Sequence, residues 1–342
     1  GDCKIMKLHH RSFFVMLALV VPGLSGCGGN NTTQPATTVD AGKADLGRYL
    51  FYDKRLSGNG TLACASCHFQ HLAFTDGQAV SEGSTGEFTP RNAQPLQNLN
   101  HHTTFTWANP SLLTLERQME VPLFGENVVE MGVNDSNKAQ ILQRIASDPF
   151  YQSKFSIAFA NDPNHANPVT WTNIIQAIAT FERTLISDNS RYDQFLAGKT
   201  TFTAEELRGK NLFFSEKAGC SECHNGFNFS DDKFHNIGLY NLDGKGAYPE
   251  PNRGVMELSG LPQDMGKFRT PSLRNIAMTA PYMHDGSVAT LEAVLDIKMK
   301  NPSKPLALTP QDKSDLIAFL KTLTDSAFLT NPALADPFTQ KN

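Results

Sequence analysis

Two short stretches, Cys64-Ala65-Ser66-Cys67-His68 and Cys220-Ser221-Glu222-Cys223-His224, decide how this chain folds. Each has the pattern Cys-x-x-Cys-His, which is the attachment motif for haem of the c type. The two thiols add across the vinyl groups of the haem, and the adjacent histidine becomes an axial ligand of the iron. The sequence therefore predicts two covalently bound haem c groups.

Neither chance nor another cysteine chemistry explains the two motifs. A chain of this composition would contain roughly 0.003 copies of such a motif by chance, and two are present. A thioredoxin-like redox pair does not need a histidine directly after its second cysteine. The two halves of a zinc knuckle lie about 12 to 20 residues apart, far closer than these motifs. We therefore favour the haem interpretation.

The other two of the six cysteines, Cys3 and Cys27, lie in a predicted leader. Residues 12–24 form an apolar stretch after Met6 and basic residues, which is the layout of a signal peptide and too short to span a membrane. Leu24-Ser25-Gly26-Cys27 resembles the lipobox of bacterial lipoproteins, and an ordinary signal peptide cut nearby is the alternative. We expect a lipoprotein on the periplasmic side, anchored through Cys27 and sorted to the outer membrane.

Length and charge fit two domains and exclude some partners. The 342 residues include 34 acidic and 30 basic ones without a block of like charge, so a nucleic-acid surface is not expected. After the leader (1–27) and a polar tether (28–40), we predict an N-terminal haem domain over 41–198. A C-terminal haem domain would then cover 199–342.

Apolar periodicity predicts helices and no convincing sheet. Leu46, Tyr49 and Leu50 lie at helical spacing before the first motif. Thr203-Ala204-Glu205-Glu206 is a capping box for a helix with Leu207 and residues 212–214 on its apolar side. One further helix carries Trp171, Ile174, Ile175, Ile178 and Leu185, and a final one, capped by Thr309, carries Leu316, Phe319, Leu320 and Leu323. The chain is predicted to be mainly α, with its two halves built on one plan.

Several further blocks resemble the bacterial di-haem cytochrome c peroxidase and MauG superfamily over nearly the whole mature chain. In the first half these are residues 46–53, Ala73-Phe74-Thr75-Asp76-Gly77, Arg91-Asn92 and Glu130-Met131-Gly132. In the second half they are residues 220–229, 269–275 and 280–286. Residues 106–110, 122–126 and 323–325 look most like the MbnH-type branch, whose members accompany a small secreted copper-binding protein and can oxidise a tryptophan on it.

The resemblance implies a fold, a set of ligands, a peroxidatic role for the haem domain over 41–198 and an electron-transfer role for that over 199–342. It implies two cytochrome c-like haem domains facing each other, with His68 and His224 as the proximal iron ligands. A calcium ion between the haems would be held by the Asn92 side chain and the carbonyl oxygens of Thr279 and Pro281, and oxygen ligands suit such a hard cation. Trp107 matches the family tryptophan between the haems, where it could relay electrons or holes. Simple packing is the alternative role for Trp107.

The resemblance also implies a distal pair at the first haem. Cleavage of a peroxide needs an open iron position, a base, and a polar group that stabilises the departing hydroxide. Gln118 and Glu130 match this pair, and Glu126 is a rival because the intervening stretch is longer than in the family's peroxidases. We favour Glu130, since Glu-Met-Gly follows the family pattern. A solvated loop charge is the alternative for either glutamate.

A ligand that closes the first haem in many relatives is missing here. Peroxidases of the family carry a blocking histidine in a Ser-x-Gly-His stretch, and the matching residues are Ser81-Glu82-Gly83-Ser84. The resemblance then implies a five-coordinate iron that reacts with peroxide without prior reduction. His71, His101 and His102 are the nearby substitutes, and we expect each of them at the surface or in a loop.

The sixth ligand of the second haem departs from the family pattern. In relatives it is a methionine or a tyrosine, fourteen residues after the position of His284, and here that position holds Lys298. Met299, Lys298 or no protein ligand are the alternatives. We rank Met299 first, because a one-residue shift would bring its thioether to the iron.

Three functions are compatible with two haems. We favour an oxidoreductase that uses hydrogen peroxide to oxidise a partner protein, for example at a tryptophan side chain. The others are a cytochrome c peroxidase fed by a small cytochrome or copper protein, and a pure electron carrier. The missing histidine favours the first over the second, and Gln118 and Glu130 disfavour the third. Glu130 would move the peroxide proton, Gln118 would orient the oxygens, and Trp107 would share an oxidising equivalent with the second haem.

Overall fold

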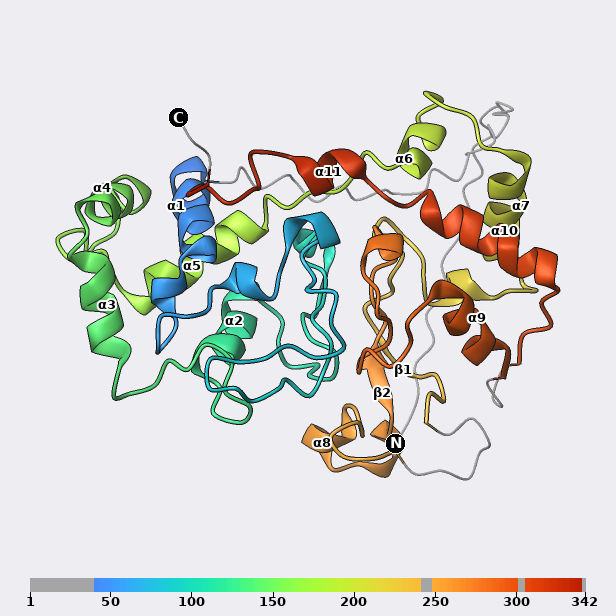
Figure 1. Cartoon of the computed structure of the whole chain (residues 1–342), viewed down its shortest axis with the longest axis horizontal. Coiled ribbons are helices and arrows are strands. Elements are labelled where there is room, and N and C mark those ends of the chain that lie inside the picture. The colour runs from blue at the N-terminus through green and yellow to red at the C-terminus, as the bar shows by residue number, and fades with distance from the viewer. Residues whose placement is uncertain (1–39, 241–247, 301–304, 340–342) are drawn as a thin grey trace, which may run out of the picture. The chain divides into compact units, whose positions relative to one another are not determined.

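The computed structural model describes residues 40–240, 248–300 and 305–339. The predicted leader with Cys27 and nearly all of the predicted tether lie outside the described residues. Within the described residues the fold is mainly α, as predicted (Figure 1). This described part has no helix with the length and apolar character needed to cross a membrane.

Helices joined by long loops make up most of the described chain. The helices are α1 (Ala41–Tyr52), α2 (Leu115–Phe124), α3 (Lys138–Ala146), α4 (Pro149–Ala158), α5 (Trp171–Glu182), α6 (Arg191–Leu196), α7 (Ala204–Phe213), α8 (Met256–Ser259), α9 (Leu291–Lys300), α10 (Pro310–Lys321) and α11 (Ser326–Thr330). Strands β1 (Phe234–Asn236) and β2 (Lys267–Arg269) pair antiparallel, with Phe234 opposite Arg269. The sequence did not predict this sheet, because strands of three residues are too short to show an alternating pattern.

Each haem motif is preceded by a helix that crosses another helix at a glycine. In the first half α1 packs on α5 (Figure 1), and a β-carbon at Gly47 would lie 1.9 Å from the carbonyl oxygen of Ala177. In the second half α7 packs on α10, and a β-carbon at Gly209 would lie 1.8 Å from the carbonyl oxygen of Asp315. Any larger residue would force these helices apart. The same packing therefore occurs in both halves.

Two hydrophobic clusters surround these crossings. The first includes fully buried Leu46, Leu50, Phe51, Ile174 and Ile178, and the second includes buried Phe213, Leu291, Leu316 and Phe319. The C-terminal segment returns to the first cluster, where Phe328 and Leu334 are buried and Gln70 Nε2 donates to the carbonyl oxygen of Phe328 at 3.1 Å. The proposed boundary between 198 and 199 lies between α6 and α7 and stays a prediction.

The predicted helix caps are present, but three details of the predicted helices were wrong. Thr203 and Thr309 cap α7 and α10 as predicted. The helix α5 ends at Glu182, so Leu185 is buried in the loop that follows it. The helix α10 ends at Lys321, so Leu323 is buried in the turn before α11 and not on the helix. On α7 the face with Gly209 and Phe213 packs on α10, which leaves Leu207 and Phe214 exposed.

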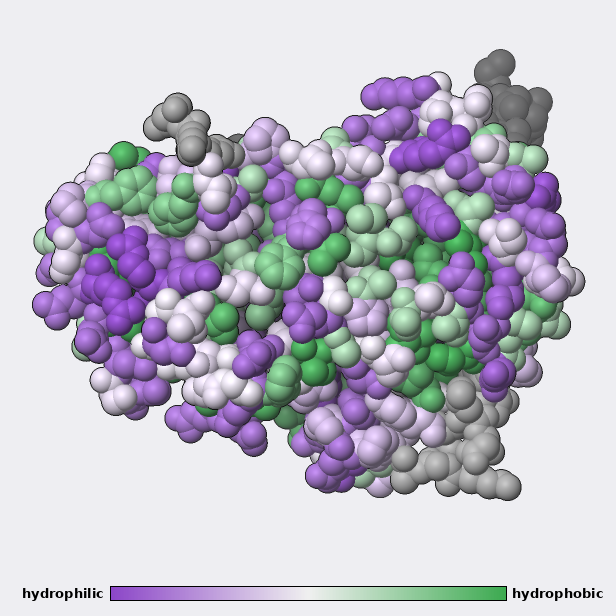
Figure 2. All heavy atoms as spheres, in the orientation of Figure 1, coloured by the Kyte–Doolittle hydropathy of each residue, from purple (hydrophilic) through white to green (hydrophobic). Residues whose placement is uncertain are grey.

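Hydrophobic and hydrophilic residues are mixed on the surface. Figure 2 shows hydrophilic residues gathered over α3, with hydrophobic and polar residues mixed over α4 and over much of the rest of this face. The large exposed apolar side chains come from separate elements and loops, for example Phe88, Leu113, Ile157, Leu196 and Leu258. Surface hydropathy alone therefore does not mark a docking site for a partner protein.

Candidate functional site

The first motif presents a histidine with one free ring nitrogen. Cys64–Ser66 form a 3₁₀ turn, and His68 Nδ1 lies 2.6 Å from the carbonyl oxygen of Phe74. Because a carbonyl oxygen can only accept, Nδ1 carries the ring proton and Nε2 keeps its lone pair. Burial lowers the pKa of His68, which favours the neutral ring. This arrangement is the one that a metal-binding histidine requires.

The second motif repeats this geometry. Cys220–Glu222 form a 3₁₀ turn, and His224 Nδ1 lies 2.9 Å from the carbonyl oxygen of Phe229. Burial, together with the positive charge of Lys298, lowers the pKa of His224 to about 4. Phe74 and Phe229 both have a positive φ, 63° and 52°, which is uncommon for a bulky residue. Sequence reasoning missed these two carbonyl partners, because backbone conformation leaves no residue-type signal at a phenylalanine.

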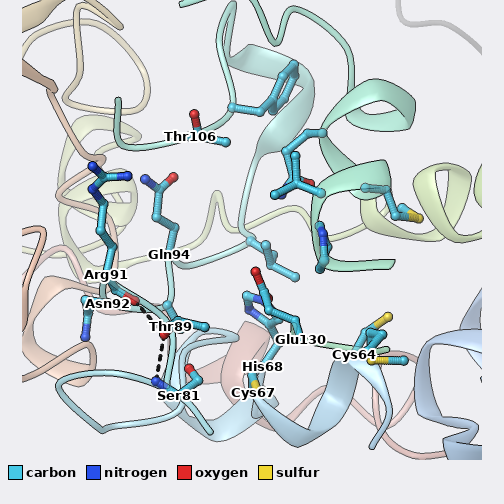
Figure 3. Close-up of a pocket in the computed structure, with 18 of the residues that line it drawn as sticks. Cys64, Cys67, His68, Ser81, Thr89, Arg91, Asn92, Gln94, Thr106 and Glu130 are labelled. Atoms are coloured by element: carbon cyan, nitrogen blue, oxygen red, sulfur yellow. Dashed lines mark hydrogen bonds between the residues drawn. The ribbon is translucent and has the colours of Figure 1, made fainter. Parts of the chain in front are cut away.

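A cavity of about 280 Å³ adjoins the first motif (Figure 3). Its lining includes Cys64, Cys67 and His68, and apolar residues from several loops and α2: Leu62, Leu96, Leu99, Phe105, Leu115, Met119 and Leu123. Two thiols, a free imidazole nitrogen and apolar walls together suit a covalently attached haem. The residues present therefore fit the group that the motif predicts.

The predicted distal residues line this same cavity. Gln118 comes from α2, whose N-terminus is capped by Thr114, and Glu130 comes from the loop that follows α2. The loop is held on both sides of Glu130, since Val129 N donates to the Glu87 carboxylate at 3.0 Å and Met131 N donates to the Pro122 carbonyl at 2.9 Å. Burial raises the pKa of Glu130. Glu126 is exposed and does not line the cavity, so the structure brings Glu130 and Gln118 together.

No second histidine enters this cavity from the residues that the structure describes. Among the described lining residues His68 is the sole histidine. The segment 81–84 packs closely against the loop of Glu130, where a β-carbon at Gly83 would lie 2.0 Å from the Val129 carbonyl oxygen. His71 and His101 are exposed, as predicted.

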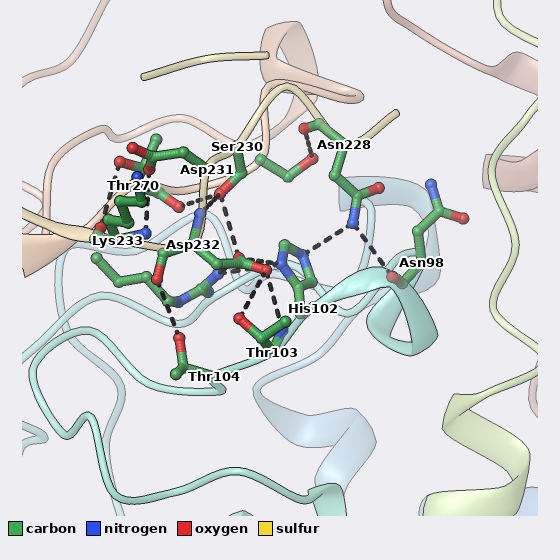
Figure 4. A network of polar contacts seen from close by, with 12 residues as sticks. Asn98, His102, Thr103, Thr104, Asn228, Ser230, Asp231, Asp232, Lys233 and Thr270 are labelled. Atoms are coloured by element: carbon green, nitrogen blue, oxygen red, sulfur yellow. Dashed lines mark hydrogen bonds and ion pairs between the residues drawn. The ribbon is translucent and has the colours of Figure 1, made fainter. Parts of the chain in front are cut away.

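His102 lies in a loop, which is one of the two predicted placements, and it is not at the surface. Its side chain is 4% exposed, and its Nδ1 lies 2.6 Å from the Asp232 carboxylate (Figure 4). The amide of Asn228 lies 3.3 Å from Nε2 on the other side of the ring, and Arg269 pairs with Asp232 at 3.0 Å. Because these partners lie more than 120 residues further along the chain, the local sequence around His102 could not reveal them.

Trp107 and Asn92 form a second connection between the halves. Trp107 Nε1 donates to the Asn92 carbonyl at 2.8 Å, and Asn92 N donates to the His284 carbonyl at 2.8 Å. The Asn92 amide nitrogen donates to the Gln78 carbonyl at 2.7 Å, which leaves its side-chain oxygen as the atom that could bind a cation. Thr279 and Pro281 precede His284 on the same loop. Both Trp107 and Asn92 also line the cavity of the first motif.

Sequence reasoning missed Glu182 and Arg269 as cavity residues. Glu182, the last residue of α5, is buried and lines the cavity, and burial raises its pKa to about 8. Arg269 reaches the cavity from β2 in the second half. The sequence signal for Glu182 was a single acidic residue on an otherwise apolar helix. The periodicity of that helix predicted only that it packs in the core.

The candidates for the sixth ligand of the second haem lie on α9. The Lys298 residue is partly exposed, but its amine end is buried, which lowers its pKa. This amine interacts electrostatically with the thiols of Cys220 and Cys223 and with the His224 imidazole. Met299 is half-buried and packs against the second hydrophobic cluster.

Comparison with known proteins identifies a matching family model and several relatives of this chain. Residues 41–201 match the family model of the di-haem cytochrome c peroxidases. The methylamine utilization protein MauG of Methylorubrum extorquens is 34% identical over 304 residues, which cover 85% of this chain and 81% of MauG. The cytochrome c551 peroxidase of Nitrosomonas europaea is 33% identical over 299 residues, covering 86% of this chain and 84% of the peroxidase.

Solved structures agree with the fold. A MauG-like protein associated with microbial copper homeostasis superimposes with a TM-score of 0.83 at 49% identity, covering 87% of this chain and 93% of that protein. The di-haem peroxidase BthA of Burkholderia thailandensis, at 22% identity, superimposes with a TM-score of 0.68 and supports the fold alone.

Proposed function

Because this chain belongs to the di-haem cytochrome c peroxidase and MauG family of enzymes, we propose that it uses hydrogen peroxide to oxidise a partner protein. A tryptophan side chain on a small secreted metal-binding protein is the proposed substrate. The observation that carries this proposal is the cavity at the first motif, which contains Gln118 and Glu130. Among its described lining residues, no histidine other than His68 could close the iron.

Each cavity residue has a defined task in this proposal. Haem held by Cys64, Cys67 and His68 would supply the iron chemistry that cleaves peroxide. The Glu130 carboxyl would take up the proton of the incoming peroxide and return it to the departing oxygen, and burial, which raises its pKa, favours its holding that proton between the two steps. The Gln118 amide orients the peroxide oxygens. Trp107, fixed by its hydrogen bond to Asn92, relays oxidising equivalents toward the second half.

We include a calcium ion and a cellular location in this proposal. The Asn92 side-chain oxygen and the carbonyl oxygens of Thr279 and Pro281 would bind the calcium, and the contact between Asn92 and His284 supports their proximity. The protein would work on the periplasmic side of the cell envelope. A lipid anchor at Cys27 and the outer membrane are the proposed attachment and site.

A cytochrome c peroxidase that draws electrons from a small cytochrome or copper protein is the second candidate. The similarity to the cytochrome c551 peroxidase of Nitrosomonas europaea favours it. A pure electron carrier is disfavoured, because a carrier has no use for a buried carboxyl and an amide in an open cavity.

Spectroscopy of the fully oxidised protein tests the proposal. The wild type, matured with a haem-attachment system, should contain two haems per chain by pyridine haemochrome assay, and replacement of Cys64 and Cys67 by alanine should remove one. Electron paramagnetic resonance of the oxidised wild type should show a high-spin iron. Addition of peroxide to the wild type should change the spectrum without added reductant. A resting state that is entirely low-spin and inert until reduced would reject an open first haem.

Product analysis separates the two candidate functions. Incubation with peroxide and the small secreted protein encoded next to this gene should add oxygen to a tryptophan, detected by mass spectrometry of peptides. Rapid turnover with a reduced small cytochrome, without any modified partner, would instead support the peroxidase.

A further inference from the structure

The turns that follow the two haem motifs, residues 68–74 and 224–229, share an unusual backbone. Each turn ends at the phenylalanine whose carbonyl oxygen accepts from the motif histidine, at 2.6 Å for Phe74 and 2.9 Å for Phe229. Both phenylalanines have a positive φ, 63° and 52°. A bulky residue keeps such a conformation only where the packing around it holds it in place. The neighbours of these two rings therefore determine where the carbonyl oxygens lie.

One aromatic neighbour of each ring comes from its own half. The ring centroid of Phe51, on α1, lies 6.0 Å from that of Phe74, and the centroid of Phe213, on α7, lies 5.9 Å from that of Phe229. Phe51 and Phe213 each come four residues after the glycine at which their helix crosses its partner. These two contacts are therefore equivalent and belong to the plan that both halves share.

A closer aromatic neighbour of each ring comes from the other half. Phe328, on α11 near the C-terminus, lies 5.7 Å from Phe74, and Tyr192, on α6, lies 5.4 Å from Phe229. Gln70, in the first turn, also donates through Nε2 to the Phe328 carbonyl at 3.1 Å. Although α6 follows α5 in the chain, it lies on the side of α7 and α10 (Figure 1), and Tyr192 is buried in the second cluster. The helices that follow α5 and α10 thus exchange sides.

Hydrogen bonds tie these two helices together where the chain segments cross. One oxygen of the Asp325 carboxylate accepts from Phe328 N at 3.1 Å and so caps α11. The other accepts from Asn189 N, just before α6, at 3.0 Å. Tyr192 N donates to the carbonyl oxygen of Thr322, just after α10, at 2.9 Å. The junction between the halves therefore fixes the position of both aromatic residues.

We propose that each half positions the proximal histidine of the other half. Phe328 is the positioning residue for His68, and it acts by packing on the phenylalanine of the first turn. Tyr192 has the same role for His224 in the second turn. In each case the carbonyl oxygen is held where it accepts from Nδ1, and this hydrogen bond orients the imidazole and strengthens Nε2 as a donor to the iron. The inference concerns the resting protein and does not rest on the proposed function.

Two alanine variants, each checked for two haems per chain, test the proposal and serve as controls for each other. Phe328→Ala should speed hydrogen exchange at the backbone amide of Phe74. It should also raise the reduction potential of the first haem alone, because a weaker hydrogen bond makes His68 a poorer electron donor. Tyr192→Ala should have both effects at Phe229 and at the second haem alone. Exchange is measured by mass spectrometry of peptides, and the potentials by spectroscopic redox titration.

Three further variants separate positioning from a general loss of packing. Tyr192→Phe keeps the ring and should match wild type in both measurements. Phe155→Ala removes a fully buried ring of the first cluster whose aromatic neighbours are Tyr151 and Phe159. It should lower the free energy of unfolding and leave both potentials unchanged. The variant with alanine in place of both cysteines of the first motif assigns the two potentials to the two haems.

The result for Phe328→Ala decides the assignment at the first haem. Equal shifts of both potentials, a shift at the second haem alone, no shift at all, or an equal shift in Phe155→Ala would each overturn it. Phe328→Leu keeps much of the buried volume without the ring, so it should fold where alanine does not and show a smaller shift of the same sign. A wild-type potential and wild-type exchange in Phe328→Leu would also overturn the assignment. The same outcomes with the haems exchanged decide the role of Tyr192.

Discussion

His102 Nδ1 lies 2.6 Å from the Asp232 carboxylate, and this contact joins segments that are 130 residues apart. Both side chains are buried, 4% and 10% exposed. Asp232 also pairs with Arg269 at 3.0 Å and accepts from the backbone N–H of Thr103 at 2.9 Å. One carboxylate thus fastens the loop around His102 to the second half of the chain.

The first prediction concerns the charge of Asp232. Asp232→Asn leaves the buried guanidinium of Arg269 without a counter-charge, which should cost about 3 kcal/mol of unfolding free energy at pH 7. Although burial opposes it, the hydrogen bond from His102 lowers the pKa of Asp232 to about 2. The contribution is complete above the unfolded pKa of about 3.9 and is lost as the pH falls toward 2. Urea denaturation should show the difference between wild type and variant shrinking over that range.

Asp135 offers a matched control for this measurement. Its side chain is 98% exposed and pairs only with Lys138, three residues away. Asp135→Asn should change the unfolding free energy by less than about 0.5 kcal/mol. An Asp232→Asn variant as stable as Asp135→Asn would show that the network does not stabilise the fold.

The second prediction concerns the helix crossing at Gly47. A β-carbon there would lie 1.9 Å from the Ala177 carbonyl oxygen, so Gly47→Ala must separate α1 from α5 and should cost at least about 2 kcal/mol. Gly42, on the same helix, has no atom closer than 3.4 Å to the equivalent position. Gly42→Ala should be neutral or stabilise by up to about 1 kcal/mol, because alanine loses less backbone entropy on folding. Gly47→Ala should therefore lower the melting temperature in thermal unfolding, whereas Gly42→Ala should leave it unchanged or raise it.

The third prediction separates the two candidate general bases. Glu130 lines the cavity and has a pKa raised by burial, whereas Glu126 is exposed outside it. Glu130→Gln should slow the reaction of the oxidised protein with peroxide by roughly a hundredfold. Glu126→Gln should react at the wild-type rate in the same stopped-flow experiment. Equal rates for Glu130→Gln and wild type would remove Glu130 from the mechanism.

The sequence allowed the haem motifs, the mainly α fold and the pairing of Gln118 with Glu130 beside the first motif to be predicted. Those residues belong to local motifs or to blocks with a known family pattern, so the one-dimensional sequence contains the signal. The helix N-termini at Thr203 and Thr309 were predictable for the same reason, since the capping box at Thr203 and the cap at Thr309 are signals within a few consecutive residues.

Other features depend on contacts between distant segments and leave no local signal. The buried pairing of His102 with Asp232 is one, and the carbonyl partners of His68 and His224 are others. Lys298 shows a further limit: its position on α9 was visible in the sequence, but its burial beside the second motif was not. Composition and periodicity indicate which residues have the chemistry for a site, whereas the fold determines which of these residues are in contact.

The last prediction concerns the buried carboxyl of Glu182. Burial raises its pKa to about 8, while the positive charge of Arg183 opposes and the negative charge of Glu116 adds to this effect. The folded protein therefore holds a proton that the unfolded chain loses above about pH 4.3. Since the folded state binds more protons in this window, the unfolding free energy should fall as the pH rises from about 4.3 to about 8, by up to about 4 kcal/mol.

Glu182→Gln cannot ionise, so its stability relative to wild type should increase steadily over this range. Glu206→Gln is the control, because its ion pair with Arg191 at 2.8 Å lowers the pKa of Glu206, and its effect should be constant above pH 5. Urea denaturation of the three proteins, with both haems attached, between pH 5 and pH 8.5 measures these slopes. Parallel curves for wild type and Glu182→Gln would show that Glu182 is already ionised in the folded protein.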